Sequence, residues 1–186
     1  MTEFSAFYPA IVPDMPGCPE VGIDLELARI SNEFCSETWV YSTDIEEIVM
    51  AGDEDLTPML PSGTELVGII SAQTEDGRQV YNFKIESNTM IFDEVATKDY
   101  ELNLIVALKK PITATDVPDI LYRNHLETIV AGVKARLFLS PKKSWSDPAL
   151  ADYYKRIYLS ELSRYSIKAY RDSHVCNAMA SGGRFV

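Results

Sequence analysis

The stretch DILYRNHLETIVAGVKARLFL (residues 119–139), followed by SPKKSWSDP (residues 140–148), decides how this chain folds. Apolar residues recur in its first part at steps of three and four: Tyr122, Leu126, Ile129, Val130, Val133 and Leu137. This spacing predicts one apolar face on an α-helix, with Pro118 suited to its start and Pro141 ending it. Gly132 costs about 1 kcal/mol relative to alanine inside a helix, so we expect another backbone to approach it closely.

A second helix is predicted directly after this corner. Asp147 followed by Pro148 is a typical start for this second helix. The first helix should be capped by either Thr115 or Asp116. The apolar face of the second helix should comprise Leu150, Tyr154, Ile157, Tyr158, Tyr165 and Ala169. Because the connection is short, the helices over 118–172 should pack antiparallel. We expect the packing between them to involve Ile129, Val133, Leu137, Trp145, Tyr154, Ile157 and Tyr158.

Outward from this pair, the chain predicts an α+β fold. Ile23, Leu27, Ile30 and Phe34 lie at helical steps and predict an N-terminal amphipathic helix over 20–38. The β region, residues 40–110, contains strand-like runs at 40–50, 65–72, 80–85, 89–92 and 100–108, which should form a small, mostly antiparallel sheet. Residues 1–19 and 173–186 should be extended arms. We expect one domain over 1–172 and a C-terminal tail over 173–186.

Charge is distributed unevenly along the sequence. The formal net charge is −11, and residues 1–133 hold 24 Asp and Glu against 7 Lys and Arg. Residues 134–186 hold 4 acidic residues against 10 basic ones. The acidic part should repel nucleic acid, whereas the basic part could meet an acidic neighbour or simply be a solvated, internally paired surface. We expect no signal peptide, no membrane span and free thiols at Cys18, Cys35 and Cys176.

The motif content of the sequence predicts no enzyme, no cofactor and no metal site. The sequence contains no GxxxxGK[ST], GxGxxG, GxSxG, HExxH or CxxC motif. Ser140-Pro-Lys-Lys143 matches SxxK, but it lies in the corner between two predicted helices, and no SDN or KTG accompanies it. His125 should face solvent or cap a helix rather than act in catalysis. The acidic clusters, such as Asp53-Glu-Asp55, are either solvated loops or a surface that repels DNA. Trp145 either wedges the helical corner or stacks on a base or cation.

Three segments, in order, resemble a known family. They are PGCPEVGIDLELARISNEFCSETW (16–39), GTELVGIISAQTEDGR (63–78) and ELNLIVALKKPITATDVPDILYRNHLETIVAGVKARLFLSPKKSWSDPALADYYKRIYLSEL (101–162). Together they resemble the head–tail adaptor subunits of short-tailed bacteriophages, a head-completion family that includes tail tubular protein A-like chains. The likeness covers most of the chain, and the order of the segments is more specific than any one of them.

The resemblance implies a structural protein of the virion rather than an enzyme. Such subunits form a ring, usually of twelve copies, that binds beneath the portal protein, extends the DNA channel and docks the tail nozzle. Double-stranded DNA would pass through the ring without specific binding. The expected location is the head–tail junction, with the host cytoplasm as the place of assembly.

Two alternatives and one site hypothesis accompany this expectation. The chain could be a tail-terminator or tail-completion subunit, or a small DNA-binding module that uses Arg164, Lys168 and Arg171 of the last helix. The C-terminal tail could dock on the portal by adding a strand or filling a groove. Its candidate docking residues are Arg171, Met179, Arg184, Phe185 and Val186, and the alternative is a frayed tail without a role.

Overall fold

The chain folds into two compact units, which are described separately. A computed structural model describes residues 1–80, 82–86 and 88–172. The helical unit comprises Met1–Thr38 and Lys110–Ser166, and the β unit comprises Trp39–Lys109 and the segment that starts at Ile167. The single domain expected over 1–172 thus divides in two, because the β region is inserted into the helical unit and has a core of its own.

The N-terminal segment is folded into short helical turns, so the expectation of an extended arm there was wrong. After β1 (Thr2–Glu3) come η1 (Phe4–Phe7), α1 (Tyr8–Ile11) and η2 (Val12–Asp14). The reason lies in a run of buried side chains at steps of three and four: Phe4, Phe7, Ile11 and Met15. Within the helical unit, the Phe7 ring meets the Tyr122 ring edge-on at 5.3 Å.

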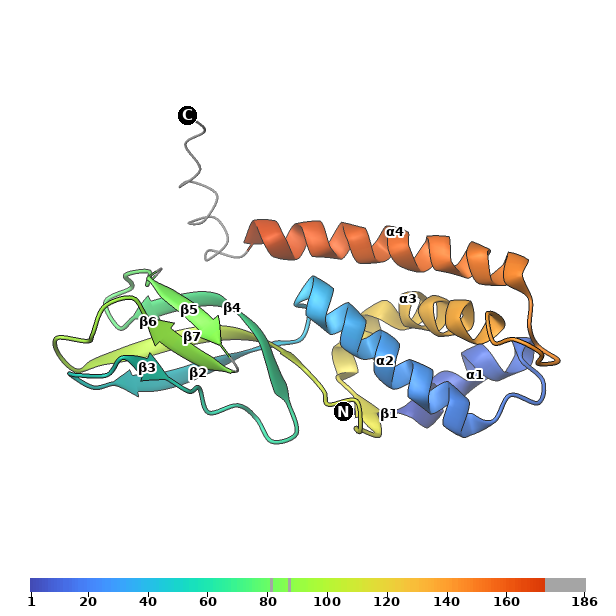
Figure 1. Cartoon of the computed structure of the whole chain (residues 1–186), viewed down its shortest axis with the longest axis horizontal. Helices are drawn as coiled ribbons and strands as arrows, with labels where there is room; N and C mark the ends of the chain where they lie inside the picture. Colours follow the sequence, from blue (N-terminus) through green and yellow to red (C-terminus); the bar gives the residue numbers. More distant parts are fainter. Residues whose placement is uncertain (81, 87, 173–186) are drawn as a thin grey trace, which may run out of the picture. The chain divides into compact units, whose positions relative to one another are not determined.

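Three long helices form the body of the helical unit (Figure 1). They are α2 (Glu20–Thr38), α3 (Asp119–Phe138) and α4 (Pro148–Asp172), of which the part up to Ser166 belongs to this unit. The start of α4 follows the prediction, since Asp147 Oδ1 accepts hydrogen bonds from the Ala149 and Leu150 amides at 2.9 and 3.0 Å. The predicted cap of α3 is absent. Pro118 holds the cap position without a side-chain bond, and Asp116 instead pairs with Lys110 at 2.9 Å.

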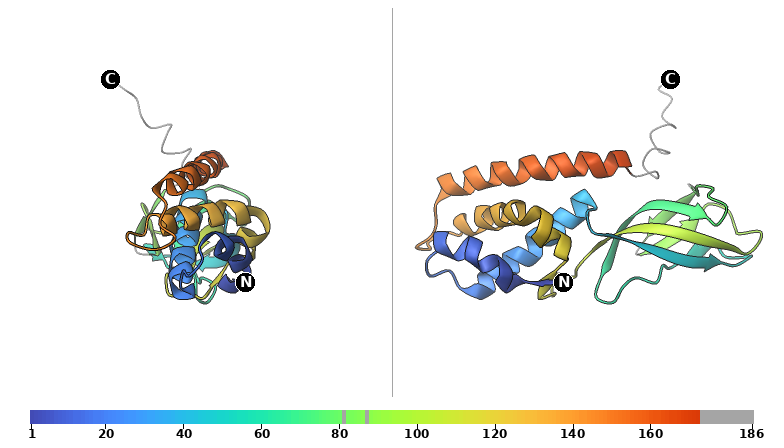
Figure 2. Two further views of the ribbon diagram at one scale, coloured as in Figure 1. Left: turned by 90° about the vertical axis from the view of Figure 1, so that its right-hand side faces the viewer. Right: turned by 180° about the vertical axis from the view of Figure 1, so that it is seen from behind.

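α3 lies at the centre of this unit, with α4 antiparallel to it (Figures 1 and 2). Ring contacts join the helices in reversed order: His125 to Tyr165 at 4.7 Å, and Phe138 to Tyr154 at 5.8 Å. A methyl group on Gly132 would lie 2.8 Å from Ile30 and 2.9 Å from Tyr158. Gly132 therefore admits close packing, as expected, but by side chains of α2 and α4 rather than by a backbone.

The β unit consists of two antiparallel three-stranded sheets. One has the order β2 (Ser42–Val49), β7 (Tyr100–Lys109), β4 (Glu65–Thr74). The other has the order β3 (Asp55–Leu56), β6 (Thr89–Phe92), β5 (Phe83–Glu86). A separate pairing joins β1 to β8 (Asp116–Val117) within the helical unit. The sheet content and direction match the α+β prediction, but the expected single sheet is divided among three.

The two three-stranded sheets share one apolar core. Its buried members are Val49, Leu66, Ile69, Ala72, Phe83, Met90, Leu102, Leu104, Val106 and Leu108. Alternation along β7 explains the arrangement, because Leu102, Leu104 and Val106 point to one face while Glu101, Asn103 and Ile105 are exposed on the other. Trp39 closes the outer face over Gly68, where an added methyl group would lie 2.9 Å from the indole ring.

Candidate functional site

α4 carries a second stripe of side chains that nothing in the helical unit covers. Its packed stripe includes Ala151, Tyr154, Tyr158 and Tyr165. The second stripe also proceeds in steps of three and four, and all its members are exposed: Leu150, Tyr153, Ile157, Ser160, Arg164, Lys168 and Arg171. We call this second stripe the exposed flank. Residues at such steps share one side of a helix, so the exposed flank is a continuous surface.

Ile157 belongs to the exposed flank rather than to the packing between the helices. Its exposed fraction is 36%. The packed stripe is centred on Ala151 and Tyr158, which rotates their preceding neighbours, Leu150 and Ile157, by about 100° to the side. The sequence pattern identified both residues as apolar but assigned them to the wrong side of the helix.

The exposed flank changes character along its length. Leu150, Tyr153 and Ile157 make its first half apolar, with exposed fractions of 41%, 58% and 36%. Arg164, Lys168 and Arg171 make its second half cationic. Among the described residues, Arg164 alone of these three has an ion pair, at 3.5 Å from Glu161, and it also lies 5.6 Å from the Tyr165 ring centre.

A groove of about 590 Å³ lies beside the exposed flank, between α3 and α4. Its lining includes Arg123, His125, Glu127, Ile157, Glu161 and Tyr165. His125 is only 6% exposed, which contradicts the expectation that it faces solvent or caps a helix. Its spacing from Tyr122 and Ile129, three and four residues, was the signal for burial.

His125 sits at a kink in α3, with φ −132° and ψ 16°. Its ring lies 5.0 Å from the Phe34 ring and 4.7 Å from the Tyr165 ring. Its Nδ1 is buried and has no hydrogen-bond partner among the described residues. Burial lowers the pKa of His125, against an opposing effect of the Glu161 carboxylate, so the neutral imidazole is favoured.

The β unit presents a polar outer face on the sheet β2–β7–β4. Asp44, Glu46 and Ile48 alternate along β2, which is an edge strand. Opposite them on β7, in register, lie Ile105, Asn103 and Glu101. A hollow of about 390 Å³ on this face is lined by Asp44, Glu46, Ser71, Gln73, Asn103 and Ile105. We call the side chains of Asp44, Glu46, Ile48, Glu101, Asn103 and Ile105 the acidic face.

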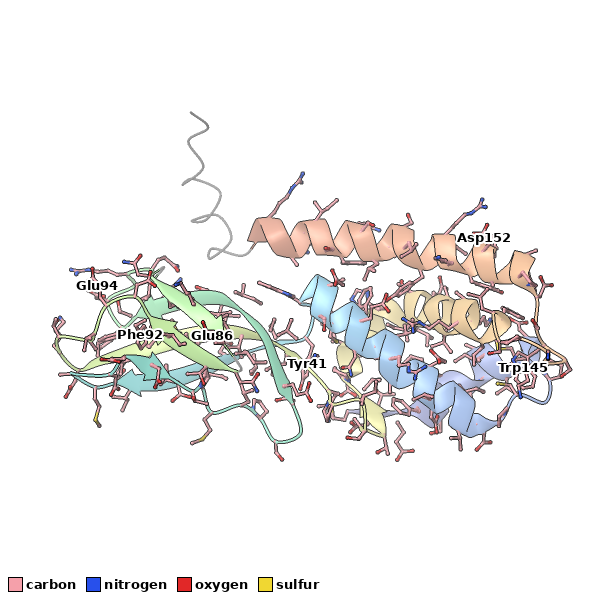
Figure 3. The ribbon with its side chains drawn as sticks, viewed as in Figure 1. Tyr41, Glu86, Phe92, Glu94, Trp145 and Asp152 are labelled. Carbon is pink, nitrogen blue, oxygen red and sulfur yellow. The ribbon has the colours of Figure 1, made fainter. Side chains whose placement is uncertain are left out.

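Almost all of the net charge of the chain is in the inserted segment. Residues 39–109 contain 14 Asp and Glu and 4 Lys and Arg, a balance of −10, out of −11 for the whole sequence. Beyond the acidic face, further acids are exposed at the end of β5 and in the bend after β6, where Glu86 and Glu94 are labelled in Figure 3. In one turn, the Thr74 hydroxyl and then Arg78 lower the pKa of the Asp76 carboxyl, which favours its charged form.

The remaining residues singled out from the sequence have separate places. Ile129, Val133, Leu137 and Tyr158 are buried, and Tyr154 is half-buried with its ring stacked on Phe138. Trp145 is half-buried in the corner before α4, with the Lys143 amine 5.9 Å from its ring centre (Figure 3). Of the tail residues, Arg171 is exposed on α4, and Met179, Arg184, Phe185 and Val186 lie outside the described residues.

Metal ligands, thiols and apolar helices are the other features of the described ranges that bear on function. No three His, Cys, Asp or Glu side chains there are grouped so as to hold a metal ion. Cys18 and Cys35 are free thiols, and burial raises the pKa of Cys35 to about 12. No described helix has the length and apolar character of a membrane span. No protein-family model and no curated protein match the chain.

Proposed function

We propose that this chain is a structural subunit of a phage head–tail adaptor, which assembles as a ring beneath the portal and extends the DNA channel. The three resembling segments support the family, and the observed order of helix, β unit and helical pair is compatible with it. The proposal depends most on one observation: a charge of −10 is concentrated in the inserted stretch Trp39–Lys109, which supplies the β core.

A high density of negative charge suits the wall of a channel for DNA. Lysine and arginine contacts to phosphate bind duplex DNA and release its counterions, so a cationic wall would slow the moving polymer. Carboxylates at high density repel it instead. In this proposal the acidic turns of the β unit lie nearest the DNA, and the helical unit provides contacts to other proteins.

The test uses the portal protein encoded by the same phage or prophage. We expect the purified chain, mixed with assembled portal, to add a ring beneath it in electron micrographs. A deletion of residues 173–186 should abolish binding while the remaining chain keeps its circular dichroism spectrum, if the tail docks on the portal. A full-length chain that leaves the portal bare would refute the adaptor proposal, and a ring at the far end of a tail would indicate a tail-terminator subunit.

A DNA-binding module is the second candidate, because Lys168 and Arg171 are exposed at helical spacing beside Arg164. The pairing of Arg164 with Glu161 and the excess of acid in the β unit weaken this reading. The module predicts duplex binding at about micromolar strength that falls steeply as salt rises. The adaptor predicts no measurable binding at moderate salt in the same titration.

A further inference from the structure

We propose that the exposed flank of α4 docks on the acidic face of the β unit in a second copy of the chain. This inference rests on the ring assembly of the proposed function and adds the surfaces that join neighbouring subunits. A contact between two unlike surfaces of one chain is heterologous, and repetition of such a contact closes into a ring when the rotation permits.

The composition of the two surfaces is complementary. The exposed flank presents cations at Arg164, Lys168 and Arg171, while the acidic face presents Asp44, Glu46 and Glu101. Each surface also has exposed apolar side chains. On the flank these are Leu150, Tyr153 and Ile157, and on the acidic face they are Ile48, 62% exposed, and Ile105, 38% exposed. Apolar area of this kind favours a protein partner over a nucleic acid.

The spacing of the charges also matches. Along a helix, positions 164, 168 and 171 span about 10 Å at 1.5 Å per residue. Along β2, Asp44 and Glu46 are about 7 Å apart, and Glu101 lies opposite Ile48, two residues further on. The acids therefore span about 13 Å. Three cations on one side of a helix can thus face three carboxylates on the sheet.

The position of β2 makes the acidic face accessible. β2 is at the edge of its sheet and pairs only with β7 among the described strands. Its outward residues Asp44 and Glu46 are both exposed. Charged side chains on an edge strand prevent indiscriminate strand pairing, and here they also select a basic partner.

Charge reversal in separate chains tests the contact. One variant is Arg164→Glu with Lys168→Glu, and the other is Asp44→Lys with Glu46→Lys. In sedimentation at low salt we expect the wild-type chain to self-associate, and each variant alone to weaken that association about tenfold or more. An equimolar mixture should restore it, because each variant then meets an opposite charge on both of its surfaces.

Two matched variants serve as controls. Lys155→Glu with Arg156→Glu makes the same charge change on another side of α4, and Asp93→Lys with Glu94→Lys makes it in an exposed turn of the β unit. Both should self-associate nearly as the wild type does. All variants should keep the wild-type circular dichroism spectrum.

Three results would overturn this inference: a wild-type chain that stays monomeric at low salt, controls that lose association equally, or a mixture that restores nothing. The proposed function fails separately. If the chain binds the portal equally well with and without the charge reversals, the adaptor function is retained and this contact is refuted. If the mixed variants recover association but the chain does not bind the portal, the contact is retained and the adaptor function is refuted.

Discussion

The helical unit and the β unit differ in how the chain builds them and in what they present to their surroundings. The helical unit draws on both ends of the described chain, Met1–Thr38 and Lys110–Ser166, whereas Trp39–Lys109 supplies the β core from one continuous stretch. The inserted stretch has a balance of −10, and all other residues together have −1. A unit with its own core can change its surface charge without disturbing the packing of the other.

If the two units have separate cores, substitutions inside those cores should have the largest effects, each confined to its own unit. Phe34 is fully buried in the helical unit, and Leu104 is nearly so in the β unit. Phe34→Ala should cost about 3–5 kcal/mol and Leu104→Ala about 2–5 kcal/mol. In amide hydrogen exchange, Phe34→Ala should raise exchange in α2, α3 and α4, and Leu104→Ala in β2, β4 and β7. Equal loss of protection in both units from either variant would show that they unfold as one.

A smaller effect is expected where the helices cross at Gly132. Ala at this position favours the helix by about 1 kcal/mol but meets Ile30 and Tyr158 at under 3 Å. Overpacking typically costs about 1–3 kcal/mol, so Gly132→Ala should lower the unfolding free energy by up to about 2 kcal/mol after that gain is subtracted. Gly22→Ala is the matched control in α2, because its nearest contact is Pro19 at 3.7 Å. Gly22→Ala should raise the free energy of unfolding by about 0.5 kcal/mol in the same urea titration. If both variants were more stable than the wild type, the close packing of Ile30 and Tyr158 against Gly132 would be contradicted.

The two units should also differ in how their stability depends on pH. Burial holds the folded-state pKa of His125 below its ordinary value of 6.5. Its neutral form therefore stabilises the helical unit above that pH, and this stability is lost as pH falls below about 6.5. Residues 39–109 contain no histidine, so the core that they form should lack this dependence. Urea unfolding between pH 5.5 and 7.5 measures it, and His125→Phe should flatten the profile. An unchanged profile in that variant would assign the dependence to other groups.

Periodic patterns predicted much of this fold. The bounds of α2 at 20–38, the strand at 89–92 and the start of α4 at Pro148 agree with the sequence pattern. Each depends on local signals, namely helical steps, alternation and the Asp147 cap. The α+β class follows from their order along the chain.

What sequence could not supply was the tertiary partner of each residue. The helical spacing of His125 indicated burial, but the sequence could not show that the rings of Phe34 and Tyr165 pack against it. Ile157 looked like core, but the rotation of α4 set by Tyr158 and Gly132 leaves it exposed. The acidic face could not be predicted from the sequence either, because Glu101 lies beside Asp44 and Glu46 only through the pairing of β7 with β2.

The smallest expected effect concerns paired charge on the surface of the helical unit. Arg156 pairs with Asp152, four residues earlier on α4 and labelled in Figure 3, and both side chains are exposed. Exposed pairs at this spacing contribute about 0.3–0.5 kcal/mol, so Arg156→Gln should lower stability by no more than that. Lys134→Met should cost more, because the Lys134 side chain is only 10% exposed while its amine pairs with Asp14 at 2.5 Å and lies 5.2 Å from the Tyr154 ring centre. Thermal melts at low and high salt distinguish the two variants. High salt should remove the small loss of stability in Arg156→Gln. Most of the loss in Lys134→Met should remain, because burial limits the screening of that ion pair. If both effects vanished in salt, the half-buried pair of Lys134 with Asp14 would contribute no more to stability than the exposed pair of Arg156 with Asp152.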